Sequence, residues 1–141
     1  MRILFDTNIL LDALLAREPF VADAAFLLER VESGQVEGFM SATTVTDVHY
    51  LVGRQTKSAE VAIAAVTRLL ALMEICAVDR GVLEQAIALR LTDFEDAVQV
   101  VSAIKLGLEA IVTRDVDGFT GSPIPVFSPK DMRNRLMSQN Y

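Results

Sequence analysis

Residues 2–12 read Arg-Ile-Leu-Phe-Asp-Thr-Asn-Ile-Leu-Leu-Asp, and the interpretation of the whole chain starts from this stretch. The apolar run 3–5 is typical of a strand buried on both faces of a parallel sheet. It stops at Asp6, whose carboxylate would be costly to bury without compensation. Thr7 or Asn8 can cap the apolar helix that follows. Such a strand end is where α/β proteins place their functional sites, but Asp6 can also be only a helix cap, and this stretch leaves both interpretations open.

The length and composition predict one compact domain spanning residues 1–141, with roughly two-thirds of its unfolded surface buried. The chain is 52% hydrophobic and only 6% aromatic, which fits aliphatic helices packed on a buried sheet and excludes a disordered chain. The single cysteine, Cys76, excludes an internal disulfide framework and a cysteine-based zinc site. We expect Cys76 to be a small core residue.

The charge of the chain restricts its partners. A net charge of −6 argues against broad electrostatic binding to nucleic acid, so a nucleic-acid substrate would be held locally or through divalent cations. Asp6 and Asp12 interrupt the first apolar segment, which excludes a signal peptide. No run approaches the roughly 18 apolar residues that a membrane helix needs, and we therefore expect a cytoplasmic protein.

Strand patterns alternate with helical patterns along the chain. We expect strands near residues 3–5, 38–42, 74–78, 110–113 and 125–127. Between and after them we expect helices starting near residues 9, 20, 43, 58, 79, 92 and 128, most of which have a serine, threonine or aspartate where the cap belongs. This alternation predicts an α/β fold with a mostly parallel sheet.

Four carboxylates lie near predicted strand ends or helix starts: Asp6, Asp47, Asp96 and Asp115. Each has an ordinary structural explanation, since acids in a first helical turn are stabilised by about 0.3–1 kcal/mol. The spacing from Asp93 to Asp96 also fits a capping box.

The parallel sheet brings these acids together. The carboxyl ends of its strands share one edge, so Asp6 and Asp115 should face one crevice, which Asp96 can join. Two carboxylates 4 Å apart repel by about 4 kcal/mol at an effective dielectric of 20, which raises their pKa values unless a cation neutralises them. The donors are all oxygens, a set that selects Mg²⁺ or Mn²⁺. The lone histidine, His49, is expected to be a partly exposed helix residue.

Four blocks of sequence resemble those of the PIN domain ribonucleases, and most closely the small toxins of toxin–antitoxin pairs. The blocks, in order, are residues 5–8 (Phe-Asp-Thr-Asn), 41–50, 93–103 and 111–115 (Ile-Val-Thr-Arg-Asp), followed by Phe119 and the segment 125–129. The resemblance implies a PIN-like three-layer fold, with a five-stranded parallel sheet of order 3-2-1-4-5 and helices on both faces. It also implies a metal-dependent endoribonuclease, a homodimer and a small antitoxin that blocks the acidic crevice with a basic side chain.

Carried over by position, the resemblance makes Asp6, Asp96 and Asp115 metal ligands and adds Asp47 as a fourth catalytic acid. It gives supporting roles to Asn8, Thr113 and Asp117. Arg114, beside the fourth acid, is either a contact to a substrate phosphate or a surface arginine. Asp12 is expected at the surface or beside a metal ligand.

Two positions depart from the family pattern. The second acid is commonly glutamate, and Asp47 is one methylene shorter, which favours a water-mediated role. The acid that often precedes the phenylalanine of the fourth block is replaced by Gly118, and Asp117 can substitute for it.

Two other functions remain possible from the sequence alone. One is a catalytically weak or inactive PIN-like module that binds RNA or protein. The other is a phosphatase with Asp6 as phosphoryl acceptor, which would need a general acid where Asn8 stands.

Overall fold

A five-stranded parallel sheet in the order β3-β2-β1-β4-β5 forms the centre of the computed structural model, which describes residues 1–139. The order predicted from the resemblance, 3-2-1-4-5, is confirmed. The strands are β1 (Arg2–Phe5), β2 (Glu37–Ser41), β3 (Glu74–Cys76), β4 (Ala110–Val112) and β5 (Val126–Phe127). The helices are α1 (Thr7–Leu14), α2 (Val21–Glu32), α3 (Ala42–Thr56), α4 (Ala59–Leu72), α5 (Arg80–Leu89), α6 (Phe94–Lys105), the 3₁₀ helix η1 (Val116–Phe119) and α7 (Pro129–Ser138).

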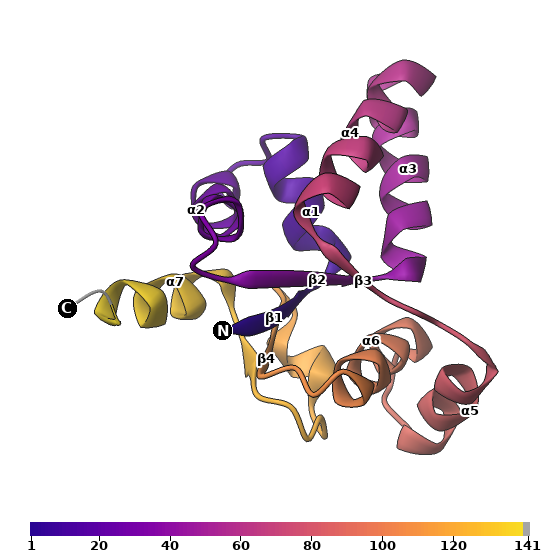
Figure 1. The fold of residues 1–141 in the computed structure, drawn as a ribbon. Helices are drawn as coiled ribbons and strands as arrows, with labels where there is room; N and C mark the ends of the chain where they lie inside the picture. Colours follow the sequence, from indigo (N-terminus) through magenta and orange to yellow (C-terminus); the bar gives the residue numbers. More distant parts are fainter. Residues whose placement is uncertain (140–141) are drawn as a thin grey trace.

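The central strand β1 pairs with β2 on one side and β4 on the other, so that Leu4 lies between Phe39 and Ile111. Its side chains alternate between two cores, as a strand buried on both faces requires. Ile3 and Phe5 pack with residues of α1, α2, α3, α4 and α7, whereas Leu4 packs with residues of α6 and η1. In Figure 1, α1 to α4 lie above the sheet and α6 lies below it, while α7 lies beside the strands.

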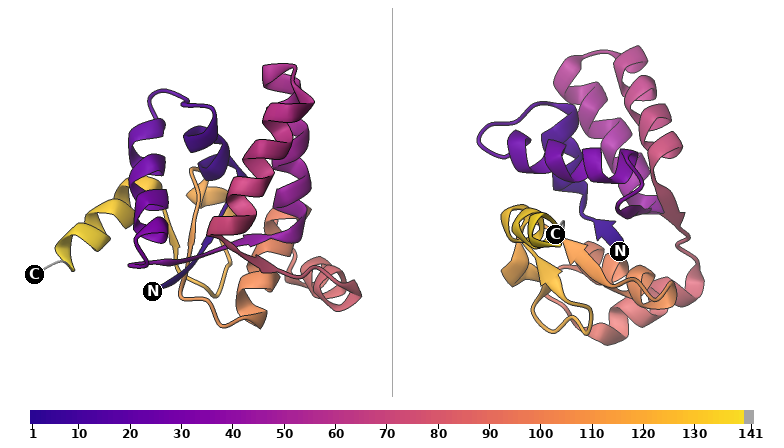
Figure 2. Two further views of the ribbon diagram at one scale, coloured as in Figure 1. Left: turned by 45° about the horizontal axis from the view of Figure 1, so that its top comes forward. Right: turned by 60° about the vertical axis from the view of Figure 1, so that its left-hand side comes forward.

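The hairpin of α3 and α4 extends well beyond the sheet, as the two views in Figure 2 show. Its two helices pack closely at Gly53, where an added Cβ would lie 3.5 Å from the Cβ of Ala62. α3 ends at Thr56, shortly after Gly53, so the glycine lies inside the helix and faces α4.

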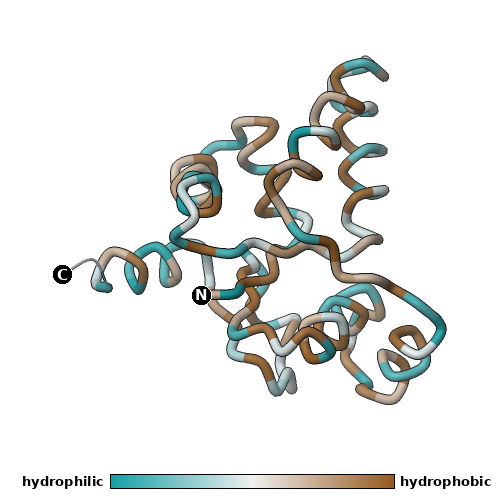
Figure 3. Tube along the Cα trace, in the orientation of Figure 1, coloured by the Kyte–Doolittle hydropathy of each residue, from teal (hydrophilic) through white to brown (hydrophobic). Residues whose placement is uncertain are grey.

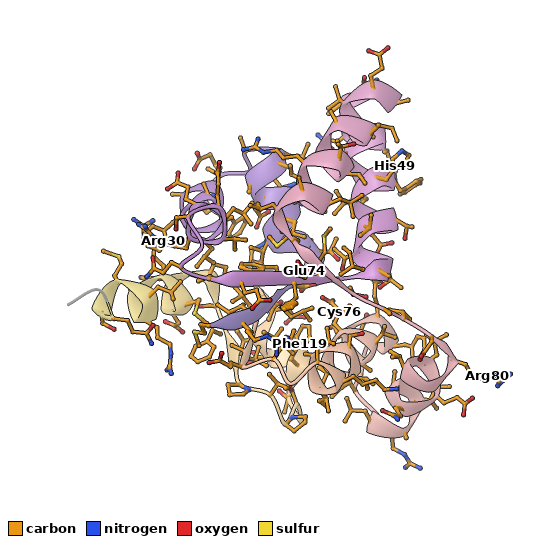
Figure 4. All side chains as sticks on the ribbon, viewed as in Figure 1. Arg30, His49, Glu74, Cys76, Arg80 and Phe119 are labelled. Carbon is orange, nitrogen blue, oxygen red and sulfur yellow. The ribbon has the colours of Figure 1, made fainter. Side chains whose placement is uncertain are left out.

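Hydrophobic segments occupy the strands and the inner turns of the helices, and hydrophilic segments lie mostly on outer turns and loops (Figure 3). Cys76 and Phe119 are buried in the core beneath the sheet, whereas His49 is exposed on the outer side of α3 (Figure 4). The positions expected for Cys76 and His49 are therefore confirmed. No helix within residues 1–139 is both long and apolar enough to cross a membrane.

The start of α1 decides between the caps that the sequence allowed, which were Asp6, Thr7 and Asn8, and it bears on the site. Asp6 itself, with extended backbone angles (φ −64°, ψ 151°), is the N-cap, in place of Thr7 or Asn8. Asp6 is the single residue between β1, which ends at Phe5, and α1, which begins at Thr7. This tight connection fixes the Asp6 backbone at the carboxyl edge of the sheet.

Candidate active site

A cleft of about 440 Å³ opens at the carboxyl edge of the sheet, between α1, α3, α6 and the segment that follows β4. Its lining includes all four predicted catalytic acids. The lining residues are Asp6, Thr7, Asn8, Asp47, Tyr50, Leu51, Asp93, Glu95, Asp96, Gln99 and Asp115. The six carboxylates in this set have no lysine or arginine among them, so the cleft is strongly negative.

Asp6 is held rigidly at the base of the cleft. Its Oδ1 accepts hydrogen bonds from the backbone N–H of Thr7 (2.7 Å) and from Nε2 of Gln99 (2.9 Å), and its Oδ2 accepts one from Oγ1 of Thr113 (2.7 Å). A carboxylate offers about four lone-pair positions. Three are occupied, which leaves one on Oδ2 for a further ligand.

Thr113 links the first and fourth acids. The hydroxyl of this fully buried residue donates to Asp6 and accepts from the backbone N–H of Asp115 at 3.0 Å. The carboxylate of Asp115 turns toward its own chain, where Oδ1 accepts from the N–H of Gly118 at 3.2 Å and caps η1. A Cβ at Gly118 would collide with the Asp115 carboxylate, so the glycine makes room for this cap.

The third acid, Asp96, lies in the first turn of α6, whose N-cap is Asp93. Asp93 accepts from the N–H of Asp96 at 3.0 Å, as the capping interpretation predicted. Burial, followed by the negative charges of Asp6, Asp93 and Asp115, raises the pKa of Asp96 to about 7. Asp96 therefore both belongs to the cap of α6 and is electrostatically coupled to the first and fourth acids.

The second acid, Asp47, lies beyond the first turn of α3 and pairs with Glu95 of α6. The hydrogen bond with Asp47 is the largest cause that raises the pKa of Glu95, which reaches about 7; burial and the charges of Asp47, Asp93 and Asp6 add to it. Below about pH 7 Glu95 is therefore largely protonated in the absence of a cation. A divalent cation in the cleft would favour release of that proton.

The donor set fits a hard divalent cation. It contains carboxylate and amide oxygens and no nitrogen or sulfur ligand, which is the chemistry that Mg²⁺ and Mn²⁺ prefer. Among the described residues, one buried acceptor at the cleft, Oε1 of Gln99, has no hydrogen-bond partner. Within residues 1–139 no three acidic, histidine or cysteine side chains are already arranged as a complete ligand set. Asp115 in particular would have to turn away from Gly118.

The sequence model of the PIN domain matches residues 2–117, which include strands β1 to β4 and every acid of the cleft. The chain belongs to the PIN domain family. No curated protein sequence matches it.

Solved structures with this PIN domain fold cover nearly the whole chain. A toxin–antitoxin complex from Klebsiella pneumoniae is 25% identical, with a TM-score of 0.67 over 90% of this chain and 97% of that one. VapBC-1 from nontypeable Haemophilus influenzae is 16% identical, with a TM-score of 0.70 over 92% and 99%. VapC20 of Mycobacterium tuberculosis, described as a toxin that cleaves the sarcin-ricin loop, is 20% identical, with a TM-score of 0.63 over 77% and 86%.

The other residues selected from the sequence lie in different places around this PIN domain cleft. Asn8 lines it, but the donors to Asp6 in the described residues are Thr7, Gln99 and Thr113. Asp117 is exposed in η1 and outside the set of residues that line the cleft. The roles proposed for Asn8 and Asp117 stay predictions.

Arg114 lies over a separate hollow, lined by Pro19, Phe20, Asp23, Ser128, Pro129 and Lys130 as well as by Arg114 itself. Its Nε is 2.8 Å from Oδ2 of Asp12, and its guanidinium stacks 3.9 Å from the centre of the Phe20 ring. Asp12, expected at the surface or beside a ligand, is fully buried. The sequence left Arg114 as either a phosphate contact or a surface arginine. The phosphate contact stays a prediction, and the guanidinium is engaged with Asp12 and Phe20.

Two residues of the cleft, Glu95 and Gln99, received no role from the sequence. A signal for Gln99 was present, since it follows Asp96 by three residues and so lies on the same helical face. Glu95 gave no such signal, because its pairing with Asp47 depends on how α3 and α6 approach each other.

The raised pKa values predict how the stability of the cation-free protein depends on pH. The folded state binds more protons than the unfolded state between about pH 4 and 7, because the pKa values of Asp96 and Glu95 rise from 3.8 and 4.5 to about 7. The free energy of unfolding should therefore fall as pH rises through this window. Burial raises the pKa of Asp12 in the same direction, whereas the lowered pKa of the helix cap Asp79 acts only at more acidic pH.

Thermal unfolding at pH 5.5, 7.0 and 8.0 with EDTA tests this dependence, and we expect the highest melting temperature at pH 5.5. Asp96→Asn should flatten the profile, while Asp131→Asn, at an exposed position of α7, should leave its shape unchanged. A melting temperature that rises steadily from pH 5.5 to 8.0 in the wild type would contradict the assignment.

Proposed function

We propose that this PIN domain protein is a Mg²⁺- or Mn²⁺-dependent endoribonuclease and the toxin of a toxin–antitoxin pair. The observation that carries the proposal is the convergence of Asp6, Asp96, Asp115 and the Asp47–Glu95 pair on one cleft without a compensating basic side chain in its lining. Such a cleft repels RNA phosphates unless cations occupy it.

Asp6, Asp96 and Asp115 would hold the ion, with the Asp47–Glu95 pair beside them. Asp6 is already fixed by three hydrogen bonds and offers its remaining lone pair on Oδ2. A divalent cation in such a site supplies a more acidic water and neutralises charge that develops on the phosphodiester in the transition state.

Protons compete with the cation for Asp96 and Glu95, since both carboxyls have a pKa of about 7 in its absence. The affinity for the cation should therefore increase as pH rises toward 8. The chain needs no protein nucleophile for this hydrolysis.

Cleavage of a fluorescent single-stranded RNA tests the function. We expect cleavage in the presence of about 1–5 mM Mn²⁺ or Mg²⁺ and no cleavage with EDTA. The rate of cleavage should increase between about pH 6 and 8. In parallel, Mn²⁺ should raise the melting temperature at pH 8 by several degrees, since an ion at 100 times its Kd stabilises by about 2.7 kcal/mol.

A binding module without catalysis is the second candidate. It is favoured by the orientation of Asp115, whose carboxylate caps η1 instead of facing the other acids as a finished ligand. RNA binding with neither cleavage nor stabilisation by Mn²⁺ would establish the binding module and exclude the nuclease.

The first proposed protein partner is an antitoxin, and the solved structures of similar fold support it. Structures with this fold include toxin–antitoxin complexes, so we propose a small antitoxin that inserts a basic side chain into the acidic cleft. A short reading frame beside the gene, whose product co-purifies with the chain and inhibits cleavage, would support it.

We also propose a homodimer, acting in the cytoplasm, in which exposed apolar residues such as Ile87 and Phe94 are covered. Light scattering of the purified chain measures that oligomeric state.

A further inference from the structure

Gln99 is a buried amide in the middle of α6, one helical turn beyond Asp96. Its side chain is 1% exposed, although it borders the acidic cleft. Burial of an amide is unfavourable unless its donors and its acceptor all find partners, whereas leucine or methionine would fill a similar volume without that requirement. The neighbouring buried polar residue of α6, Ser102, meets the requirement locally, because its hydroxyl donates to the carbonyl of Val98 at 2.8 Å.

The two ends of the Gln99 amide differ in their partners. Nε2 donates to Oδ1 of Asp6 at 2.9 Å, across 93 residues of sequence. Oε1 is buried and has no hydrogen-bond partner among the described residues. The amide is therefore oriented by Asp6, and its acceptor oxygen is left over at the edge of the cleft.

The chemistry of the cleft limits what can satisfy this oxygen. Six of the eleven residues that line the cleft are carboxylates, which in their ionised form accept hydrogen bonds and so cannot donate to Oε1. Thr7, Asn8 and Tyr50 carry donors and also line the cleft, but within the described residues no hydrogen bond joins them to Oε1. A water in the coordination shell of a divalent cation is a strong donor, because the ion polarises its O–H bonds. A ligand held on the free lone pair of Asp6 would also lie near the amide that contacts the same carboxylate.

We propose that Gln99 is a positioning residue of the cation site, which fixes Asp6 through Nε2 and accepts through Oε1 a hydrogen bond from a cation-bound water. This inference rests on the proposed function, since it requires a divalent cation on Asp6. It adds a residue of α6 that acts through its neighbours and does not itself contact the RNA.

Calorimetric titration of Mn²⁺ into the full-length protein at pH 7.5 tests the role. Gln99→Met removes both hydrogen-bonding ends at similar volume, and we expect its Kd for Mn²⁺ to increase about tenfold or more, as for other residues that orient metal ligands. Ser102→Ala is the matched control on the same helix and should bind Mn²⁺ within about twofold of wild type. A Gln99→Met affinity that also stays within twofold would overturn the proposal.

Gln99→Glu separates the two ends of the side chain and replaces Gln99→Met if that variant does not fold. It keeps acceptor oxygens but, when ionised, cannot donate to Asp6. We expect it to bind Mn²⁺ more tightly than Gln99→Met does. If Gln99→Met does not fold, we expect Gln99→Glu to bind Mn²⁺ at least as tightly as wild type. Binding weaker than in Gln99→Met, or weaker than wild type where only Gln99→Glu folds, would exclude the acceptor role.

Failure of this inference can be told from failure of the proposed function. If wild type binds Mn²⁺ and Asp6→Asn does not, the cation site stands, and the role of Gln99 is overturned by equal binding in Gln99→Met or, for its acceptor end, by the weaker binding of Gln99→Glu. If wild type binds no Mn²⁺ at millimolar concentration, both proposals are wrong.

Discussion

Asp6→Asn should abolish RNA cleavage while the protein stays folded. We expect kcat/KM to fall by at least about a thousandfold, or ~4 kcal/mol of transition-state stabilisation, because the variant loses the negative charge that would bind the cation. The asparagine can keep most of the local hydrogen bonds. Its carbonyl oxygen can accept from Thr7 and Gln99, and its NH₂ can donate to the Thr113 hydroxyl, whose own proton is then free to turn.

The test compares three variants with wild type in their cleavage rates and Mn²⁺ affinities. The variants are Asp6→Asn, Asp96→Asn and Asp131→Asn. Asp131 lies exposed in the first turn of α7, away from the cleft, and its variant should cleave at the wild-type rate. Circular dichroism and a cation-free melting temperature close to that of wild type would show that Asp6→Asn is folded. Wild-type cleavage by both Asp6→Asn and Asp96→Asn would rule out the proposed mechanism.

Local sequence signals were enough to predict most elements of the fold. Ser58, Asp79, Asp93 and Ser128 were recognised as caps, and each accepts a backbone N–H at the start of its helix. Such signals work because a cap and its partner are separated by only about three residues. The order of the sheet, by contrast, came from the resemblance to the PIN domain family, since periodicity does not say which strands are neighbours.

Asp6 shows that a helix cap and an acid that lines the cleft can be the same residue. From sequence, a helix cap and a functional acid were alternatives. In the structure Asp6 is the N-cap of α1 and also lines the cleft, because β1 runs directly into α1 at the carboxyl edge of the sheet. The cap geometry is thus part of what aims this carboxylate into the site.

The features that were missed depend on contacts between distant segments. In the sequence, Glu95 is only one of the acids in a first helical turn. Its pairing with Asp47 of α3 depends on the tertiary structure. Gln99 received no role from the sequence, and its contact with Asp6 spans 93 residues. Asp12 contacts Arg114 across 102 residues, so one sequence without relatives gives no sign that its carboxylate is buried.

Arg114→Ala is the substitution from which we expect the largest loss of stability among those proposed. The carboxylate of Asp12 is 0% exposed, and the guanidinium of Arg114 contacts both of its oxygens, at 2.8 and 3.3 Å. The other cation nearby, Arg17, is more distant at 3.9 Å. Removal of Arg114 leaves a buried charge largely uncompensated, which should lower the free energy of unfolding by about 2–4 kcal/mol, below the fully buried limit because Arg114 is partly exposed.

Urea denaturation at pH 5.5 and 8.0 provides the measurement, and the sign of the pH effect identifies Asp12 as the cause. Burial already raises the pKa of Asp12, and loss of Arg114 raises it further, so the folded variant takes up a proton as pH falls. The loss of stability should therefore be smaller at pH 5.5 than at pH 8.0. Arg80→Ala, which breaks an exposed pair with Glu84 at 3.1 Å, should change stability by only about 0.5 kcal/mol at either pH.

The double variant Asp12→Leu/Arg114→Ala decides whether the pair is needed for stability or whether each partner is needed only because the other is present. Replacement of both members of a buried ion pair by apolar groups is often neutral, whereas removal of one member is not. We therefore expect Asp12→Leu to restore most of the stability that Arg114→Ala loses, and to abolish the difference between pH 5.5 and 8.0. If Arg114→Ala alone costs no more than Arg80→Ala, the Asp12 carboxylate is compensated by other groups, and Arg114 becomes free to serve the substrate phosphate contact predicted from the sequence.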